Sequence, residues 1–246
     1  MGVMPETFKL RQHDTTFSPT GLWQFAAGAI GTDEVGSFNL TQDATHGAPT
    51  EVGGYIPTNQ ALQDFIYYRN NASDLEYVGA MSFACLFKAT QYARSDGVSD
   101  QLYRILVNGR GGATDERYAF HFNATGHIMY RHQATTAGPT QTNYQLTLSE
   151  LHYDLNRWHH LAFTKDSAGT TVKVYLDGAL IGQSTLGAAA TTSGTTYCNM
   201  GGMNGYNGGP HDGMTQASCV IFDKELTGDE IAYLANRCLG TPRTRN

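Results

Sequence analysis

The chain has 246 residues and a formal net charge of −6, and charged residues make up 15% of it, below the roughly 25% of typical soluble domains. Low charge combined with 28 glycines and many threonines favours short strands joined by turns over a helical bundle. Because the basic cluster is limited to Arg237, Arg243 and Arg245, nucleic acid is not an expected partner. No apolar run approaches the roughly 18 residues of a membrane span.

The order of polar and apolar segments predicts one domain with two extensions. Residues 1–20 contain few apolar side chains and are interrupted by Pro5 and Pro19, which predicts an extended N-terminal arm. Residues 21–240 form the expected domain, since one all-β sandwich can fill this length, and residues 241–246 form a C-terminal tail. The start of the chain has no apolar stretch typical of a secretory signal.

The four cysteines give no support for a metal site of the zinc-finger type. They are Cys85, Cys198, Cys219 and Cys238, and no C-x-x-C spacing occurs among them. An even count permits disulfides, but a chain of this length does not require them. Cys85 and Cys219 lie inside apolar runs and are expected to be buried thiols. We therefore expect free thiols.

Alternating apolar residues predict a series of strands. In residues 78–88, Met81, Phe83, Cys85 and Phe87 share one face, which is typical of a sandwich strand covered on one side. The dipeptide Asp177-Gly178 favours a tight hairpin because both positions accept a positive φ. The predicted strands are 22–25, 78–88, 103–107, 118–123, 127–131, 158–165, 171–176, 179–183, 198–202 and 217–222.

A short helix is predicted near the end of the domain. Thr227 can cap its N-terminus, with Glu230 as the capping-box partner three residues later. Ile231, Leu234 and Ala235 then share one helical face. We expect this helix to close the domain.

The order of several motifs resembles laminin-G-like domains of the concanavalin-A-like lectin/glucanase superfamily. The strongest match is Trp158-His159-His160 in residues 158–163, followed by Val-Lys-Val-Tyr-Leu-Asp-Gly at residues 172–178. Residues 22–25 with the loop 33–40, residues 81–88 (Phe87 stands where tryptophan is usual), and residues 222–231 also match. The resemblance covers roughly residues 21–236. It implies an all-β fold, a two-sheet antiparallel jelly-roll sandwich with a short C-terminal helix.

Catalysis is not expected. Glucanases of the superfamily place closely spaced carboxylates on one strand face, but the adjacent Asp115 and Glu116 would point to opposite faces. Asp74 and Glu76 lie in a polar loop, and Asp229 and Glu230 belong to the helix cap. His159 and His160 also diverge, so they cannot chelate one metal ion. No serine or cysteine nucleophile is placed beside a histidine.

The resemblance also implies a place for a calcium ion. In related domains the ligands include an aspartate in the loop that matches residues 33–40, here with Asp33 and Asn39. The second usual aspartate is replaced by Thr215, and the nearby Asp212 could substitute for it. Calcium is therefore the one cofactor to test, and no other cofactor is expected.

A glycine-rich segment, residues 204–212, is the candidate ligand-binding loop. Tyr206, Asn207, His211 and Asp212 offer a ring, an amide, an imidazole and an acid of the kinds that hold sugars in shallow sites. The alternative is a flexible connector without a ligand. Tyr144 and Tyr153 are weaker candidates.

Two classes of function remain open for this non-catalytic structural or binding protein. The first is a virion-associated component at the virion surface, such as a bacteriophage capsid decoration or tail protein. It would contact other virion or assembly proteins through the N-terminal arm, and surface glycans through the domain. The second is a free carbohydrate-binding, lectin-like module, secreted by a non-classical route. A glycoside hydrolase is a remote third. The sequence does not choose between a monomer and a homo-oligomer.

Overall fold

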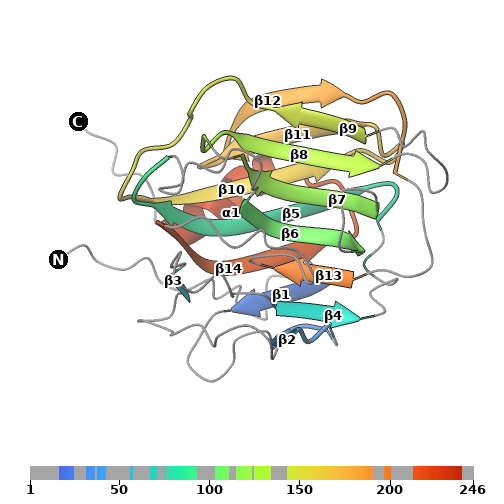
Figure 1. Cartoon of the computed structure of the whole chain (residues 1–246), viewed down its shortest axis with the longest axis horizontal. Helices are drawn as coiled ribbons and strands as arrows, with labels where there is room; N and C mark the ends of the chain where they lie inside the picture. The colour runs from blue at the N-terminus through green and yellow to red at the C-terminus, as the bar shows by residue number, and fades with distance from the viewer. Residues whose placement is uncertain are drawn as a thin grey trace.

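The computed structural model is a two-sheet sandwich with one helix outside it (Figure 1). It describes residues 17–24, 32–36, 38–42, 56–57, 67–70, 75, 77–92, 103–110, 115–123, 125–133, 143–190, 197–200 and 213–239. The strands are β1 (Gly21–Gln24), β2 (Thr41–Gln42), β3 (Ile56–Pro57), β4 (Tyr67–Asn70), β5 (Met81–Ala89), β6 (Tyr103–Arg110), β7 (Asp115–Phe122), β8 (Ile128–Gln133), β9 (Asn143–Thr147), β10 (Trp158–Lys165), β11 (Thr171–Leu176), β12 (Ala179–Thr185), β13 (Tyr197–Met200) and β14 (Met214–Phe222). The helix is α1 (Gly228–Leu239).

The described strands form two sheets in which neighbouring strands are antiparallel. The first sheet has the order β1-β14-β5-β10-β11-β12, and β3 also pairs with β14. The second sheet has the order β2-β4-β13-β6-β7-β8-β9. Strands distant in sequence therefore lie side by side, as β5 does with both β10 and β14. This architecture confirms the predicted antiparallel jelly-roll sandwich.

The strands with clear alternation were predicted best. β10 and β11 begin and end at the predicted residues. The turn after β11 has φ 50° at Asp177 and φ 87° at Gly178, the left-handed conformation that the dipeptide predicted. A Cβ on Gly178 would lie 3.0 Å from the Cα of Ala232, so glycine also lets α1 approach this turn. The strands that we did not predict are β2, β3, β4 and β9, which have two to five residues each.

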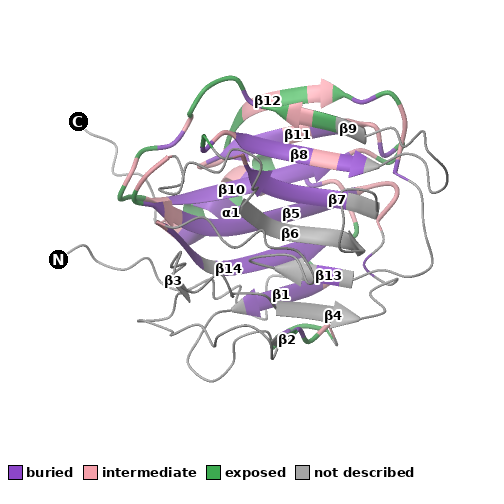
Figure 2. Cartoon of the chain, in the orientation of Figure 1, coloured by how far each residue is buried: buried purple, intermediate pink, exposed green. Residues whose placement is uncertain are grey.

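The main core fills the space between the two sheets. Aromatic side chains from opposite sheets meet there: the ring centroids of Phe83 and Phe120 are 4.9 Å apart, and those of Phe120 and Phe163 are 4.6 Å apart. These distances lie in the range for favourable aromatic pairs. Figure 2 shows the buried residues concentrated in the central strands and the exposed ones along β12.

A second core lies on the outer face of the first sheet. Ile231, Leu234 and Cys238 of α1 pack there with Leu86 of β5 and Val220 of β14. As a result β5 is buried on both faces along nearly its whole length. The prediction that this strand is covered on one side only was therefore wrong. Its outer face holds alanine, serine and leucine, and small side chains there let a helix pack closely.

The approach to α1 is held by reciprocal hydrogen bonds. The backbone N–H of Glu230 donates to Thr227 Oγ1 (3.2 Å), and the N–H of Thr227 donates to Glu230 Oε2 (2.7 Å). This is the predicted capping box. Just before it, Ser82 Oγ of β5 donates to the carbonyl of Lys224 and accepts the N–H of Leu226, both at 2.8 Å. The helix is thus tied to the sheet that it covers.

The described end of the predicted arm packs against the domain. Phe17 is buried, and its ring stacks on Tyr233 of α1 with 5.2 Å between centroids. The N–H of Thr20, the residue just before β1, donates to the carbonyl of Ile221 in β14 (2.9 Å). Residues 1–16 and 240–246 lie outside the described residues. Among the described residues, no helix has the length and apolar character needed to cross a membrane.

Replacing Thr227 with alanine tests the capping box. We expect Thr227→Ala to lower the free energy of unfolding by about 1 kcal/mol, because the N–H of Glu230 loses its acceptor. Urea denaturation followed by circular dichroism measures this change. Thr227→Ser is the matched control, since it keeps the hydroxyl and should stay within about 0.5 kcal/mol of the parent. Equal losses in both variants would contradict the capping role.

Candidate functional site

One end of the sandwich gathers polar side chains from four segments. We call it the Tyr92 rim, and its members are Thr90, Gln91, Tyr92, Asn123, Thr125, His127, Tyr153, Asp154, Arg157 and Gly213. The antiparallel pairing brings the end of β5 to the start of β14, where the N–H of Thr90 donates to the carbonyl of Gly213 (2.7 Å). The N–H of Asn156 donates to the carbonyl of Ala89 (2.6 Å), which adds the segment before β10.

Tyr153 is the centre of this rim. Its ring is buried and makes edge contacts with Phe87 (5.2 Å between centroids) and Phe122 (5.6 Å). Its hydroxyl donates to the carbonyl of Gly126 (2.9 Å). Burial raises the pKa of Tyr153 above its usual value, so the phenol stays protonated and donates at neutral pH. The turn between β7 and β8 is thereby fixed to the core.

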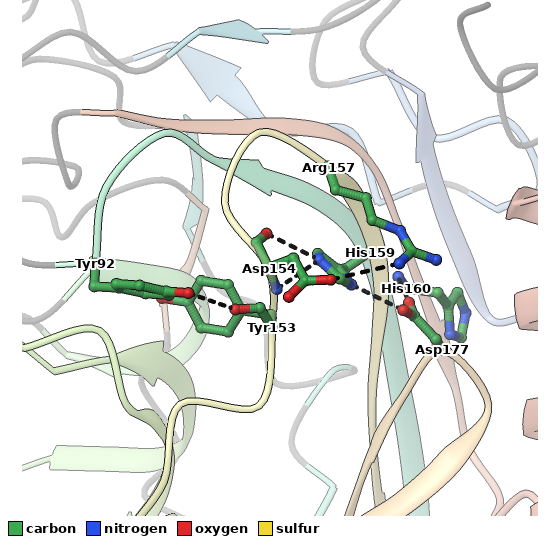
Figure 3. A network of polar contacts seen from close by, with 7 residues as sticks. All are labelled: Tyr92, Tyr153, Asp154, Arg157, His159, His160 and Asp177. Carbon is green, nitrogen blue, oxygen red and sulfur yellow. Dashed lines mark hydrogen bonds and ion pairs between the residues drawn. The ribbon is translucent and has the colours of Figure 1, made fainter. Parts of the chain in front are cut away.

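Tyr92 lies over this centre and is half-buried. Its hydroxyl donates to the backbone carbonyl of Tyr153 (3.0 Å), and the two rings are 5.4 Å apart (Figure 3). Gly126 lies so close to the backbone of Tyr92 that a Cβ on Gly126 would be 2.5 Å from the Tyr92 carbonyl oxygen. The φ of Gly126 is 86°. Glycine is therefore required at this contact. The Tyr92 ring is held in one place before any ligand arrives.

His159 ties the rim to the β11–β12 turn. Its Nδ1 lies 2.8 Å from Asp177 Oδ2, and its Nε2 accepts the N–H of Asp154 at 3.1 Å (Figure 3). Asp177 Oδ1 accepts the N–H of His160 (2.9 Å). Burial alone would raise the pKa of Asp177, but hydrogen bonds from His159 and the His160 backbone outweigh it and hold that pKa below its usual value. The imidazole of His159 thus holds a loop and a turn together, and His160 is joined to the same turn through its backbone N–H.

The exposed groups of the rim are hydrogen-bond donors and acceptors. The side chains of Asp154 and Arg157 are 77% and 65% exposed and approach to 3.5 Å, a surface ion pair of little energetic value. The hydroxyl of Thr125 bridges Asn123 Oδ1 and His127 Nδ1, both at 2.8 Å. Such groups around one half-buried ring suit a polar ligand in a shallow site.

The predicted binding loop, residues 204–212, directly precedes Gly213 of this rim in the sequence. Tyr206, Asn207, His211 and Asp212 lie outside the described residues, so their roles stay predictions. Gly213, which follows them, contacts Thr90 and Gln91, because a Cβ on it would lie 2.6 Å from Thr90 Oγ1 and 2.8 Å from Gln91 Cγ.

Tyr92 was not among the residues that the sequence indicated for this end of the sandwich. The available signal was its position just after the strongest predicted strand, where a strand end opens into a loop at the sandwich rim. Tyr153, a weaker candidate, is a buried support for Tyr92.

Asp33 and Asn39, the residues predicted to bind calcium, hold their own loop together. Asp33 Oδ1 accepts the N–H of Leu22 (2.9 Å) and of Val35 (3.1 Å), and Oδ2 accepts that of Phe38 (3.0 Å). Asn39 Oδ1 accepts the N–H of Asp33 (2.8 Å). These side-chain oxygens thus accept hydrogen bonds from backbone N–H groups. Calcium binding at Asp33, Asn39 and Asp212 stays a prediction.

Another acidic side chain in the described segments, that of Asp166, also accepts hydrogen bonds from backbone N–H groups. Asp166 Oδ1 accepts the N–H of Thr170 (2.9 Å) and of Thr171 (3.0 Å). Burial would raise the pKa of Asp166, but these bonds outweigh it and lower that pKa. Among the described residues, no group of three or more histidine, cysteine and acidic side chains is arranged to hold a metal ion.

A family comparison identifies the domain. The Laminin_G_3 model, described as the concanavalin A-like lectin/glucanases superfamily, matches residues 66–232. The chain belongs to this family. The match begins before β4 and ends within α1, so it covers β4 to β14 and the Tyr92 rim, while β1, β2 and β3 precede it. A comparison with curated protein sequences found no match.

Solved structures with the same fold include bacterial toxin binding domains. The binding domain of Paraclostridial Mosquitocidal Protein 1 aligns with a TM-score of 0.62 and 12% identity, over 89% of this chain and 52% of that one. The botulinum neurotoxin serotype G binding domain gives 0.61 and 12%, over 88% and 50%. A botulinum neurotoxin type C structure, titled for cell entry dependent on two ganglioside molecules, gives 0.59 and 13%, over 89% and 51%. This laminin-G-like chain thus spans about half the length of these structures, and the likeness shows the fold.

A buried lysine marks the opposite end of the sandwich. Lys165 of β10 is 1% exposed, and its Nζ donates to the carbonyl of Tyr77. Burial lowers its pKa to about 7, although the nearby Asp166 acts in the other direction. His132 of β8 lies in the same region and donates from Nε2 to the carbonyl of Ala188 (2.7 Å). Burial lowers the pKa of His132 to about 4, and Lys165 adds to that effect.

The lowered pKa of Lys165 makes the stability of the domain depend on pH. An unfolded lysine binds its proton below about pH 10.4, but the folded protein binds it only below pH 7. The unfolded state therefore holds more protons between these values, so stability falls as the pH decreases through this window. We expect the free energy of unfolding to be up to about 2 kcal/mol higher at pH 9 than at pH 7.

Urea midpoints at pH 7, 8 and 9 measure this dependence. In Lys165→Met the rise between pH 7 and 9 should be largely lost. Lys173 is the matched control, because it is partly exposed and pairs with Glu225 at 2.8 Å. Lys173→Met should keep the rise. The same slope in the parent and in Lys165→Met would show that other groups cause it.

Proposed function

We propose that this laminin-G-like domain is a non-catalytic binding module that takes a glycan at the Tyr92 rim. The observation that carries the proposal is the fixed Tyr92 ring, which directly follows Thr90 and Gln91, the two residues that contact Gly213 just after the predicted binding segment 204–212. A ring held before binding loses little conformational entropy when a sugar face stacks on it. Gly213 of the rim also comes directly after the segment in which Tyr206, Asn207, His211 and Asp212 were predicted to bind.

The surrounding groups supply the polar part of recognition. Thr90 and Thr125 are exposed hydroxyls, and Asp154 and Arg157 present a carboxylate and a guanidinium to solvent. Sugar hydroxyls both donate and accept hydrogen bonds, so a mixed set of side chains can orient them. The titles of similar structures support binding as the role of the fold, since they describe toxin binding domains and, in one case, gangliosides.

A non-catalytic role agrees with the chemistry of the described rim. Glycoside hydrolysis requires two carboxyl groups facing one substrate bond. Asp177 is committed to His159 and to the backbone of His160, and Asp154 lies at the surface beside Arg157. Neither is positioned as an acid and base pair. We therefore propose binding without turnover.

Removing the Tyr92 ring tests glycan binding. A printed panel of oligosaccharides identifies a ligand of the parent chain, and titration calorimetry then measures its affinity. We expect Tyr92→Ala to weaken that affinity at least about tenfold, because the stacking surface is lost. Tyr92→Phe keeps the ring and should stay within about threefold of the parent. Tyr233 on α1 is exposed at a different surface, and Tyr233→Ala should bind normally.

Two results would contradict this assignment. Binding that survives Tyr92→Ala but is lost in Tyr206→Ala would move the site from the rim to the loop alone. Turnover of an oligosaccharide by the parent chain, abolished by changing one acidic residue, would make the domain a glycosidase.

We propose as a second role that the chain is a virion-surface component, attached through its N-terminal arm. The supporting observation is the fixed base of the arm: Phe17 stacks on Tyr233, Lys224 Nζ lies 5.8 Å from the centroid of the Phe17 ring, and Thr20 bonds to Ile221. A firm base lets residues 1–16 reach a neighbouring subunit from a defined point. The competing localisation is a free, secreted lectin.

Truncating the arm tests attachment. A chain without residues 1–16 should keep its Tm within about 2 °C, because Phe17 and its contacts remain, but should no longer co-purify with particles. Mass spectrometry and immunogold labelling of particles from the source culture measure incorporation. Phe17→Ala is the comparison, and it should lower the Tm by removing a buried ring. Parent chain found only free in the medium would favour the secreted lectin.

A further inference from the structure

Two cysteines face each other across neighbouring strands of the first sheet. Cys85 of β5 and Cys219 of β14 are register partners, and both are 0% exposed. Both belong to the core between the two sheets, so their side chains point to the same face. They are free thiols in the structure, as predicted.

The backbone hydrogen bonds show which kind of pair they form. The N–H of Thr90 donates to the carbonyl of Gly213, so Ala89 and Met214 are a pair without mutual hydrogen bonds. The carbonyl of Ala89 instead accepts the N–H of Asn156, on the β10 side. The direction of the backbone N–H and C=O groups alternates along a strand, so Cys85, four residues before Ala89, also points these groups toward β10 and away from β14. Cys85 and Cys219 are therefore a non-hydrogen-bonded pair.

This pair type has the right spacing for a disulfide. Directly opposite residues of a non-hydrogen-bonded antiparallel pair have Cα atoms about 4.5 Å apart and side chains close together. Disulfides span Cα separations of about 4.4–6.8 Å. Cys85 lies close enough to Cys219 to help raise the pKa of that thiol, after the larger effect of burial. The backbone does not need to move far to join the two sulfur atoms.

A buried polar side chain distinguishes this pair from ordinary core packing. Gln216 is 1% exposed, and its amide Nε2 donates to Cys219 Sγ. An N–H donor favours the thiolate form of the sulfur, and the Gln216 bond lowers the Cys219 pKa against the larger effect of burial, which raises it. The register of β14 also shifts between Gln216 and Ser218, next to the cysteine. An irregular ladder opens more readily than a regular one.

We propose that Cys85 and Cys219 are a redox-active dithiol that a peroxide oxidises to a cross-strand disulfide. One thiolate attacks hydrogen peroxide, which breaks the O–O bond and gives a sulfenic acid and water. The partner thiol then attacks the sulfenic sulfur, the S–S bond forms, and a second water leaves. Two thiols are thus oxidised by two electrons while one peroxide is reduced to two waters.

The disulfide would join the strands that support the Tyr92 rim. β5 ends at Ala89 and β14 begins at Met214, and the residues just beyond them, Thr90 and Gly213, belong to that rim. A covalent link between the strands limits their separation. The proposal stands on the core geometry and does not depend on glycan binding.

Peroxide treatment of the whole chain tests the proposal. The parent chain should lose two of its four free thiols over hours, since both sulfur atoms are buried. A peptide containing Cys85 should be linked to one containing Cys219, about 2 Da lighter than the two reduced peptides together. The Tm should rise by about 5–10 °C, because the link closes a long loop. Dithiothreitol should reverse all three changes.

Three serine variants separate the sulfur atoms. Cys198 lies near Cys219 across the sandwich, so Cys198→Ser, which should still form the link, shows that the third core thiol is not needed. Cys238 is buried under α1 in the other core, and Cys238→Ser should also keep the link. Cys219→Ser should lose the link and the Tm rise. This variant must first show a normal circular dichroism spectrum.

Specific outcomes would overturn the assignment. A link from Cys85 to Cys198 would show that the reactive pair spans the two sheets. Two other results would show that Cys85 and Cys219 only fill space. One is oxidation of single cysteines to sulfinic acid. The other is that all four thiols stay unchanged after the whole chain has been cycled through mild urea with peroxide. Should Cys219→Ser fail to fold, Gln216→Leu replaces it, and it should slow formation of the link without preventing it.

Discussion

The burial of β5 and β10 on both faces is the constraint on which the rest of this structure depends. The second sheet covers their inner face, and α1 covers part of the outer face. A strand covered on both sides has few conformations open to it and a single register, because a slip of one residue would exchange the contents of two different cores. The ends of these strands are therefore fixed points, from which the loops at either end of the sandwich extend.

The Tyr92 rim, where we propose that a glycan binds, extends from such fixed points. Its most exposed groups lie on turns, but each turn is anchored to the core: Gly126 through the Tyr153 hydroxyl, and Asp154 through His159. Polar residues such as His159 and Asp177 could suggest catalysis in a sequence. Here their hydrogen bonds connect strands to loops. Their buried hydrogen bonds hold the rim in one shape, which lowers the entropic cost of binding.

The interior also holds groups that an ordinary sandwich core does not require. Lys165 and His132 lie between the sheets at the end away from the Tyr92 rim, and the thiols of Cys85 and Cys219 meet in the middle. Burial disfavours the charged forms of Lys165, His132 and Cys219 and shifts the pKa of each accordingly. For Lys165 this effect couples the stability of the fold to pH.

Much of the fold could be predicted from the sequence because its signals are local. Alternation placed β10 and β11, the Asp177-Gly178 pair predicted its turn, and Thr227 with Glu230 predicted the start of α1. Short strands such as β4 and β9 escaped prediction, since two to five residues carry too little periodicity. Their pairing depends on partners far along the chain.

The sequence by itself determined the class of the fold, the long strands, the terminal helix and the family resemblance. The tertiary structure alone decided which side chains meet. It placed Thr90 beside Gly213, 123 positions apart in the numbering of the chain, it turned Asp33 toward backbone N–H groups, and it brought Cys85 opposite Cys219. The physical reason is that the alternation of apolar residues in the sequence indicates the face on which each side chain lies. The neighbour of a residue across the sheet depends instead on strand order and register, which are selected by burial between segments far apart in the chain.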